Sequence, residues 1–130
     1  MGYDLRKYRA ATVAKWLHGA VLVREDIIYL IAGVTVRERK HCAPYFKRSQ
    51  PLFRDDDPVQ VYVGQWFAGG ILFLGTHGKT CVQIDSIEVA GSLVKGPMNV
   101  IKHLGLCPGQ TGEYEFDGTV LRLTMLPKEE

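Results

Sequence analysis

Short runs of alternating apolar and polar residues dominate the chain and predict a protein built mainly from β-strands. Residues 20–24 and 27–37 are rich in Val and Ile and are separated by a tight Glu25-Asp26 link, which indicates two successive strands. The second contains the continuous apolar run IIYLIAGV. Such a run is typical of a strand covered on both faces, although periodicity alone leaves a buried helix open.

The alternation resumes in the second half of the chain. The valines at alternate positions from 59 to 63 share one face of a predicted strand. Gly69-Gly70 then indicates a bend or a β-bulge. Residues 71–74 and 80–89 flank a turn at 76–79, and this arrangement predicts a hairpin.

Two helices are predicted, one near each end of the chain. Asp4 is placed as an N-cap and Gly19 as a C-terminal stop, which favours a helix over residues 5–18. Arg9 falls within the apolar stripe of that helix and interrupts it. The second helix is short: it begins at Pro97, which suits a first turn, and it ends before Gly105, which fits a left-handed stop.

A final hairpin is the strongest local feature of the sequence. Residues 113–116 and 119–125 alternate and are joined by Asp117-Gly118, a favoured pair for a tight hairpin turn. In total the chain has seven or eight short predicted strands and two helices. It is therefore expected to be a mainly β (α+β) protein, a small, partly closed β-barrel with one N-terminal helix and one short C-terminal helix. Its 130 residues predict a single domain, 1–130.

Between the two groups of strands lies an irregular segment, residues 38–58, with three prolines and no clean period. It predicts a long arm or loop rather than a helix or strand. Basic and aromatic residues are interleaved in it, so it could neutralise phosphates and stack on exposed bases, or be a solvated face with core aromatics. A further use is an assembly arm that meets the acidic residues Asp55–Asp57 of a neighbouring copy. The candidate residues of this assembly arm are Arg39, Lys40, Tyr45, Phe46, Lys47 and Arg48.

The spacing of Pro, Gly and Leu residues from the start of the second predicted helix onward allows a comparison with a known family. Pro97 is followed after six residues by Leu104-Gly105-Leu106, and one residue later by Pro108-Gly109 and a strand, turn and strand. Over residues 91–125 this pattern resembles the swapped-hairpin unit of AbrB/MazE-type transcription regulators and antitoxins. A similar helix, turn and strand also recurs in FeoA-like barrels.

The resemblance implies dimerisation through interlaced hairpins and DNA binding by basic residues before and within the short helix. Lys95 and Lys102 are the basic residues at those positions. The chain departs from the family pattern at three places. Gly91 lies one residue further from the helix, Ser92 replaces the usual arginine, and Gln110 replaces a common aspartate.

Charge is distributed unevenly along the chain. The formal net charge is +2, but residues 1–50 hold ten Lys/Arg against four Asp/Glu, and residues 51–130 hold six against ten. Such an asymmetry indicates either an anionic partner for the basic half or head-to-tail packing between copies. The alternative is that both halves fold together and the imbalance averages out over one surface. For nucleic-acid binding, the candidate residues are Arg6, Lys7, Arg9, Lys95 and Lys102.

Histidine and cysteine recur in pairs but in spacings that do not favour a metal. His77 and Cys81 are four residues apart, as are His103 and Cys107, and zinc accepts two imidazoles and two thiolates. On a strand such positions lie too far apart to share one ion, and Gly105 interrupts the second pair. We predict buried reduced thiols, no metal and no cofactor, while zinc at these pairs stays open.

No catalytic motif is recognisable, so the chain is interpreted as non-enzymatic. It has neither an apolar run of the ~18 residues that a membrane span needs nor a secretory signal, which predicts a cytoplasmic or virion protein that is not secreted and has no membrane partner. The favoured function is a structural or assembly protein that contacts itself or other assembly proteins, for example in a phage particle. The alternative is a nucleic-acid-binding regulator with a swapped-hairpin-like C-terminal unit.

Overall fold

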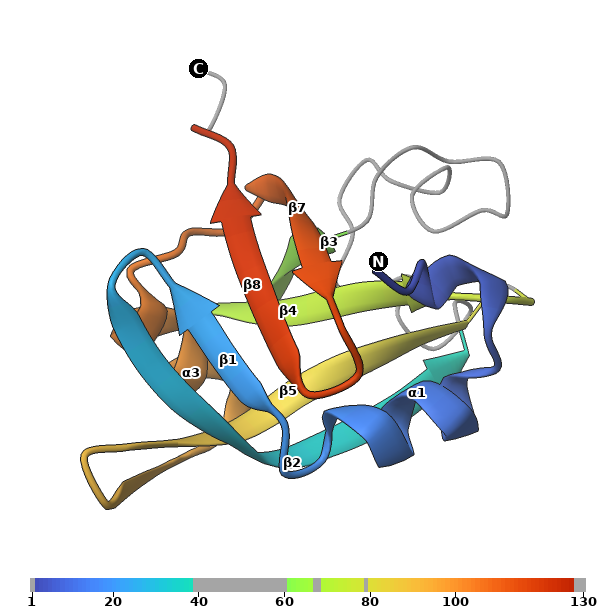
Figure 1. The fold of residues 1–130 in the computed structure, drawn as a ribbon. Helices are drawn as coiled ribbons and strands as arrows, with labels where there is room; N and C mark the ends of the chain where they lie inside the picture. The colour runs from blue at the N-terminus through green and yellow to red at the C-terminus, as the bar shows by residue number, and fades with distance from the viewer. Residues whose placement is uncertain (1, 39–60, 67–68, 79, 128–130) are drawn as a thin grey trace.

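A computed structural model describes residues 2–38, 61–66, 69–78 and 80–127 of the chain (Figure 1). Over these residues the arrangement is mainly β: two helical segments precede six strands, and one further helix precedes the last two strands. Their bounds in chain order are η1 (Leu5–Lys7), α1 (Ala10–Leu17), β1 (Val21–Arg24), β2 (Ile27–Glu38), β3 (Val61–Trp66), β4 (Gly69–Thr76), β5 (Thr80–Val89), β6 (Ser92–Lys95), α3 (Pro97–Leu104), β7 (Thr111–Phe116) and β8 (Val120–Met125).

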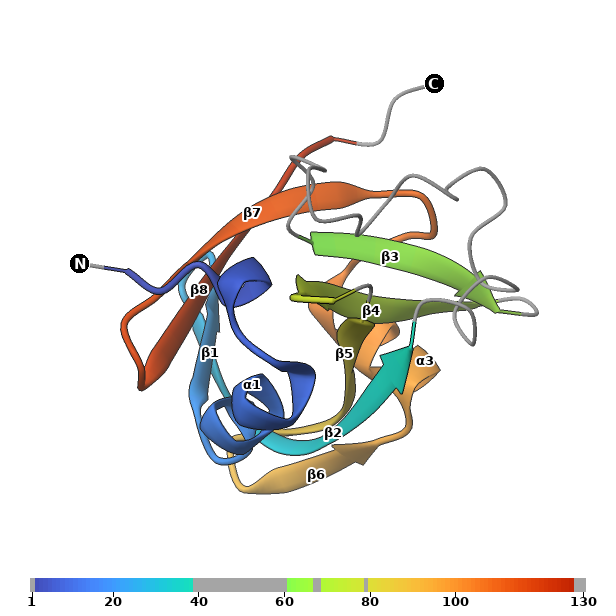
Figure 2. The ribbon, with the colours of Figure 1, turned by 90° about the vertical axis from the view of Figure 1, so that its right-hand side faces the viewer.

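The strands form the small β-barrel that the sequence predicted, and the barrel is closed rather than partly closed. In the described part of the chain the ring order is β2-β1-β8-β7-β3-β4-β5, and an antiparallel β2–β5 pairing closes it. β1 and β8 run parallel, so the first strand lies beside the last one. β6 is attached to the outside of the ring through β5 (Figure 2). Closure removes the exposed edges of an open sheet, which would otherwise pair with other chains.

The interior of the barrel is filled by aliphatic side chains at alternate strand positions. Because successive side chains of a strand point to opposite faces, each strand sends one set inward. In β8 this set includes Leu121 and Leu123, which are buried, whereas Arg122 between them is exposed. The fully buried interior includes Leu22, Ile31, Leu72, Leu74, Ile84 and Leu121.

The helical segments pack at opposite ends of the barrel (Figures 1 and 2). Leu5 of η1 and Leu17 of α1 are buried at one end, and Val100 and Leu104 of α3 are buried at the other. All four belong to the same hydrophobic cluster as the strand residues. The barrel therefore has one continuous core that runs from η1 and α1 to α3.

The predicted N-terminal helix over residues 5–18 is wrong in one respect: it is divided in two. Asp4 caps only η1, where its side chain accepts a hydrogen bond from the backbone N–H of Arg6. Tyr8 is extended, and α1 begins after Arg9. The break frees the Tyr8 carbonyl to accept a hydrogen bond from the backbone N–H of His77, which fastens the segment to the β4–β5 turn.

Gly69-Gly70 does not form the predicted bend or bulge. Both glycines belong to β4 and pair in regular register with β3. A Cβ at Gly70 would lie 2.8 Å from Cγ1 of Val63 and 3.3 Å from Cγ2 of Ile101, and one at Gly69 would lie 2.9 Å from Sδ of Met98. The absence of side chains at these two positions thus lets α3 pack closely against the strand.

The C-terminal unit is confirmed as predicted. α3 spans Pro97–Leu104, and Gly105 ends it in the left-handed conformation with φ of 70°. The backbone N–H of Leu106 donates to the carbonyl of Ile101 at 3.1 Å, as in a Schellman motif. β7 and β8 form the hairpin across Asp117-Gly118. The predicted arm at 38–58 lies outside the described residues except for Glu38, which ends β2.

Replacement of Gly70 by alanine tests the close packing of α3 on β4. Gly70→Ala is expected to lower the free energy of unfolding by about 1–3 kcal/mol, because the new Cβ overlaps Val63 and presses on Ile101. Urea unfolding measures this change. Gly33→Ala is the control: the nearest atoms to its Cβ would be side-chain atoms of Ser86, at 3.4 Å, and of Asp85, at 3.9 Å, so the free energy of unfolding is expected to stay equal or to rise by up to about 1 kcal/mol. Equal losses in both variants would contradict this account.

Candidate interaction surface

The outer face of the β1–β2 hairpin exposes large aliphatic side chains. In β2, Tyr29 and Ile31 point into the barrel and are buried, whereas Ile28 and Leu30 point outward and are 66% and 38% exposed. The prediction that the run IIYLIAGV is covered on both faces is therefore wrong for its first half. A strand of a small barrel has a single interior face, so alternate members of a continuous apolar run must lie outside.

Strand register extends this exposed row sideways. Val21 lies opposite Leu30 and Val23 opposite Ile28, and residues directly opposite each other share a face of the sheet. On the other side, Leu30 lies opposite Glu88 of β5, and Glu88 lies opposite Leu93 of β6, which is 57% exposed. We call this surface the apolar strip; it comprises Val21, Val23, Ile28, Leu30 and Leu93.

A basic hollow adjoins the apolar strip at Leu93. It lies between β6 and α3, is open to solvent and has a volume of about 460 Å³. The amide of Asn99 donates to the carbonyl of Lys95 at 2.9 Å and so ties the helix to the strand. None of the described residues that line the hollow is acidic. They are Leu93, Val94, Lys95, Asn99, Lys102 and His103.

The strip and the hollow are held together by contacts between the β1–β2 hairpin and the end of α3. Arg24 donates from Nε to the carbonyl of Leu104 at 2.8 Å, which places a cation at the negative end of the helix dipole. The ring of His103 meets the ring of Tyr29 edge to face, with 6.1 Å between centroids. These contacts fix the two parts of the surface relative to each other.

The basic residues predicted to bind nucleic acid do not come together. Lys95 and Lys102 are exposed at the α3 end, whereas Lys7 and Arg9 are exposed beside η1 and α1, at the opposite end of the barrel (Figure 1). Arg6 is already engaged in an ion pair within its own segment. The structure therefore divides the predicted set into two separate groups, and it is the pair Lys95 and Lys102 that lines the basic hollow.

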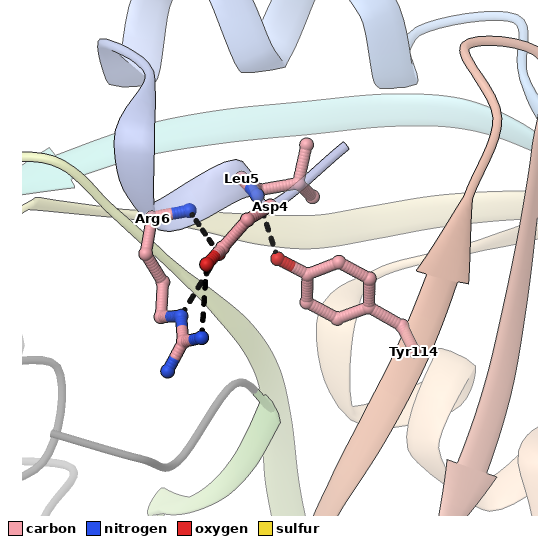
Figure 3. A network of polar contacts seen from close by, with 4 residues as sticks. All are labelled: Asp4, Leu5, Arg6 and Tyr114. Atoms are coloured by element: carbon pink, nitrogen blue, oxygen red, sulfur yellow. Dashed lines mark hydrogen bonds and ion pairs between the residues drawn. The ribbon is translucent and has the colours of Figure 1, made fainter. Parts of the chain in front are cut away.

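The ion pair of Arg6 belongs to a network that holds η1 at the barrel (Figure 3). Two nitrogens of Arg6 lie 2.9 Å from the two carboxylate oxygens of Asp4, and this contact lowers the pKa of Asp4 below its usual value. One residue away, the buried backbone N–H of Leu5 donates to the hydroxyl of Tyr114 on β7 at 2.8 Å. Arg6 is thus part of the N-terminal anchor as well as a surface cation.

An aromatic cluster completes the anchor and was not predicted from the sequence. Tyr3, Tyr8 and Trp16 pack against one another with ring centroids 4.9 to 6.0 Å apart, and Phe116 of β7 lies beside Tyr3 and Trp16. Tyr8 and Trp16 are half-buried against the core. The presence of three aromatic residues within the first sixteen positions of the sequence could have indicated this aromatic cluster.

The histidine and cysteine pairs are separated in the structure. Cys81 is buried, whereas His77 is exposed in the turn before it. His103 is on α3, while Cys107 is half-buried beyond the Gly105 break, next to Gln110. Within residues 2–38, 61–66, 69–78 and 80–127, no three His, Cys, Asp or Glu side chains are grouped so that they could hold a metal ion.

The residues of the predicted assembly arm, 39–48, lie outside the described part of the chain, so their role stays a prediction. Among the described helices, none is long and apolar enough to cross a bilayer. The chain matches no protein-family model, no curated protein and no solved structure. The resemblance of residues 91–125 to the AbrB/MazE-type unit likewise stays a prediction, although the helix and hairpin that it implies are present.

Tyr114 gives a pH test of the N-terminal anchor. Burial raises the pKa of Tyr114 to about 12, so the folded protein favours the neutral phenol. Above pH ~10 the unfolded chain loses this proton while the folded chain keeps it. We therefore expect the free energy of unfolding to fall between pH ~10 and ~12, by roughly 2–3 kcal/mol, as measured by urea unfolding.

The variant Tyr114→Phe is the control for that titration. At neutral pH it is expected to lose about 1–3 kcal/mol, because the buried N–H of Leu5 is left without this acceptor. Its stability should then depend less on alkaline pH than that of the wild type. An unchanged alkaline slope in Tyr114→Phe would show that Tyr114 is not the titrating group.

Proposed function

We propose that the protein is a non-enzymatic assembly protein that associates with copies of itself, alone or within a larger particle. The observation that supports this proposal is the apolar strip. Exposed aliphatic side chains that gather on one side of a domain are characteristic of protein–protein contact surfaces. Here they extend over three strands, β1, β2 and β6, with Glu88 of β5 between Leu30 and Leu93.

The size of the apolar strip limits the free energy of association that it can contribute. Complete burial of an Ile or Leu side chain contributes about 1.5–3 kcal/mol, so the exposed parts of Ile28, Leu30 and Leu93 contribute roughly 1 kcal/mol each. Association costs about 4–15 kcal/mol in lost translational and rotational freedom. The strip thus supplies part of a stable contact, and neighbouring polar groups have to supply the rest.

A second candidate function is nucleic-acid binding at the basic hollow. Lys95 and Lys102 project from the two sides of a hollow whose described lining contains no acidic residue, which suits a phosphate. The other basic residues predicted to bind nucleic acid lie at the far end of the barrel and cannot extend the hollow. Their location favours the assembly proposal over nucleic-acid binding. A single pair of lysines would bind a phosphate backbone weakly.

Removal of the exposed aliphatic groups tests the assembly proposal. The double variant Ile28→Ser/Leu93→Ser is expected to weaken self-association by about fivefold for each substitution, because each side chain contributes roughly 1 kcal/mol and about 1.4 kcal/mol corresponds to a tenfold change. Light scattering during size-exclusion chromatography, from dilute to concentrated protein, measures the molecular mass. Val36→Ser is the matched control: Val36 is similarly exposed and lies on β2, but opposite the inward-facing Val82, outside the strip.

A wild-type mass that stays monomeric at every concentration, together with no partner in a pull-down, would rule out the assembly proposal. Loss of association in Val36→Ser to the same extent as in the double variant would show that the contact is not at the apolar strip.

Salt dependence tests the second candidate. If the hollow binds nucleic acid through two phosphate contacts, the affinity for a labelled duplex should fall about tenfold between 50 and 200 mM salt. Lys95→Glu/Lys102→Glu should abolish it, whereas Lys7→Glu/Lys15→Glu at the other end should leave it unchanged. Fluorescence polarisation measures both. No binding to any duplex or single strand at low salt would exclude this function.

A further inference from the structure

Resting on the proposed self-association, we infer that copies of the chain associate head to tail, with an acidic strip on β7 of one copy against the basic hollow and apolar strip of the next. The acidic strip comprises Glu113, Glu115 and Asp117. The partner is therefore a second copy of this chain, bound through a different face from the one that it offers in turn.

The acidic strip is formed by the outer face of β7 and the turn that follows it. Glu113 and Glu115 are exposed and alternate with Tyr114 and Phe116, which are buried in the barrel. Asp117 follows in the turn, where its carboxylate accepts hydrogen bonds from the backbone N–H groups of Val120 and Thr119 at 2.7 and 2.8 Å.

The charge of this strip is maintained near neutral pH. The hydrogen bond from Val120, followed by that from Thr119, lowers the pKa of Asp117 below its usual value. Arg122 of β8 lies opposite Glu115 and offsets one of the three negative charges. A net charge of about −2 is left, which matches the two lysines of the basic hollow.

The acidic strip and the basic hollow face away from each other. In the ring of seven strands, β7 is separated from β5 by β3 and β4 on one side and by β8, β1 and β2 on the other. β6, which carries Leu93 and Lys95, is attached outside β5. Both ribbon views show β7 and β6 on opposite sides of the barrel (Figures 1 and 2). Within one copy the carboxylates of the acidic strip therefore cannot reach the lysines of the basic hollow.

Each of the two faces combines charge with exposed apolar groups. Tyr3 is 41% exposed beside Gly118, and its backbone N–H donates to the carbonyl of Phe116 at 2.7 Å. Leu126 is 47% exposed, and its backbone N–H donates to the carbonyl of Thr111 at 2.8 Å. These two residues stand at the two ends of the acidic strip and can meet the aliphatic side chains of the apolar strip.

A two-fold contact of one apolar strip on another would use less of this chemistry. It would bury the aliphatic residues but would leave the lysines of each hollow and the net negative charge of each acidic strip without an intermolecular partner. The head-to-tail contact pairs the lysines of one copy with the carboxylates of the next. Each added copy then leaves one acidic strip or one basic hollow available for a further copy. Such an interface generates a ring if the rotation between copies closes, and an open filament if it does not.

Charge inversion on one face at a time tests the inference. One variant, Glu113→Lys/Glu115→Lys, alters the acidic strip; the other, Lys95→Glu/Lys102→Glu, alters the basic hollow. All four side chains are exposed, so both variants are expected to fold, and circular dichroism checks that they do. Light scattering then measures the mass of each variant alone and of their equimolar mixture.

Head-to-tail association predicts that each variant alone associates at least about tenfold more weakly than the wild type and that the mixture recovers association. Recovery follows because the intact hollow of one variant meets the intact strip of the other. Lys7→Glu/Lys15→Glu, which changes the charge at a site outside both faces, should associate like the wild type.

The outcomes separate the inference from the function on which it rests. If Glu113→Lys/Glu115→Lys associates like the wild type, the head-to-tail inference is overturned while self-assembly stands. If both variants lose association and the mixture does not recover it, the two faces do not bind each other and the inference is equally overturned. A monomeric wild type overturns the head-to-tail inference, and together with no partner in a pull-down it removes the assembly proposal as well.

Discussion

The pairing of β2 with β5 is the interaction on which the rest of the structure depends. It joins the two ends of the strand order and turns a sheet into a closed barrel. The register shifts at Gly33, so the two longest strands bend together there. On the outer face the carboxylate of Asp85 accepts hydrogen bonds from Thr35 and Gln83, and Arg37 donates to Gln83 at 2.7 Å. These cross-strand contacts fasten the closing pair from outside while Ile31 and Ile87 fasten it from within.

Barrel closure also determines which side chains lie on the outer surface and are available for contacts with other molecules. It gives β2 one interior and one exterior side, so half of its aliphatic residues face outward. Because β2 takes one edge of β5, β6 occupies part of the other edge outside the ring, where it forms a hollow with α3. The acidic outer side of β7 lies across the barrel from that hollow. The basic hollow and the carboxylates of β7 are thus held apart by a rigid core, whereas the apolar strip lies between them on the side of β1 and β8. This separation of opposite charges suits repeated contacts between copies.

Local signals in the sequence were sufficient for the C-terminal unit but not for the surface. Pro97, Gly105 and Asp117-Gly118 each specify backbone geometry within a few residues, so α3 and the β7–β8 hairpin were predictable. The division of the first helix depends on a hydrogen bond between Tyr8 and His77, which are distant in sequence. The apolar strip depends in the same way on strand neighbours that no local pattern specifies. β6 was missed because four residues are too few to show a period.

The parallel contact of β1 with β8 has a consequence for the order of folding. Residues 21–24 find their partners at 120–123, close to the other end of the chain. During synthesis β1 therefore emerges about a hundred residues before β8, and the ring cannot close until β8 has emerged as well. Contacts so distant in sequence slow folding, because a long loop must be ordered before they form. Until the ring closes, the inward-facing Tyr29 and Ile31 of β2 lack the interior that later buries them, so both sides of this strand expose apolar groups during synthesis. A chaperone or a neighbouring nascent copy could cover them in that interval.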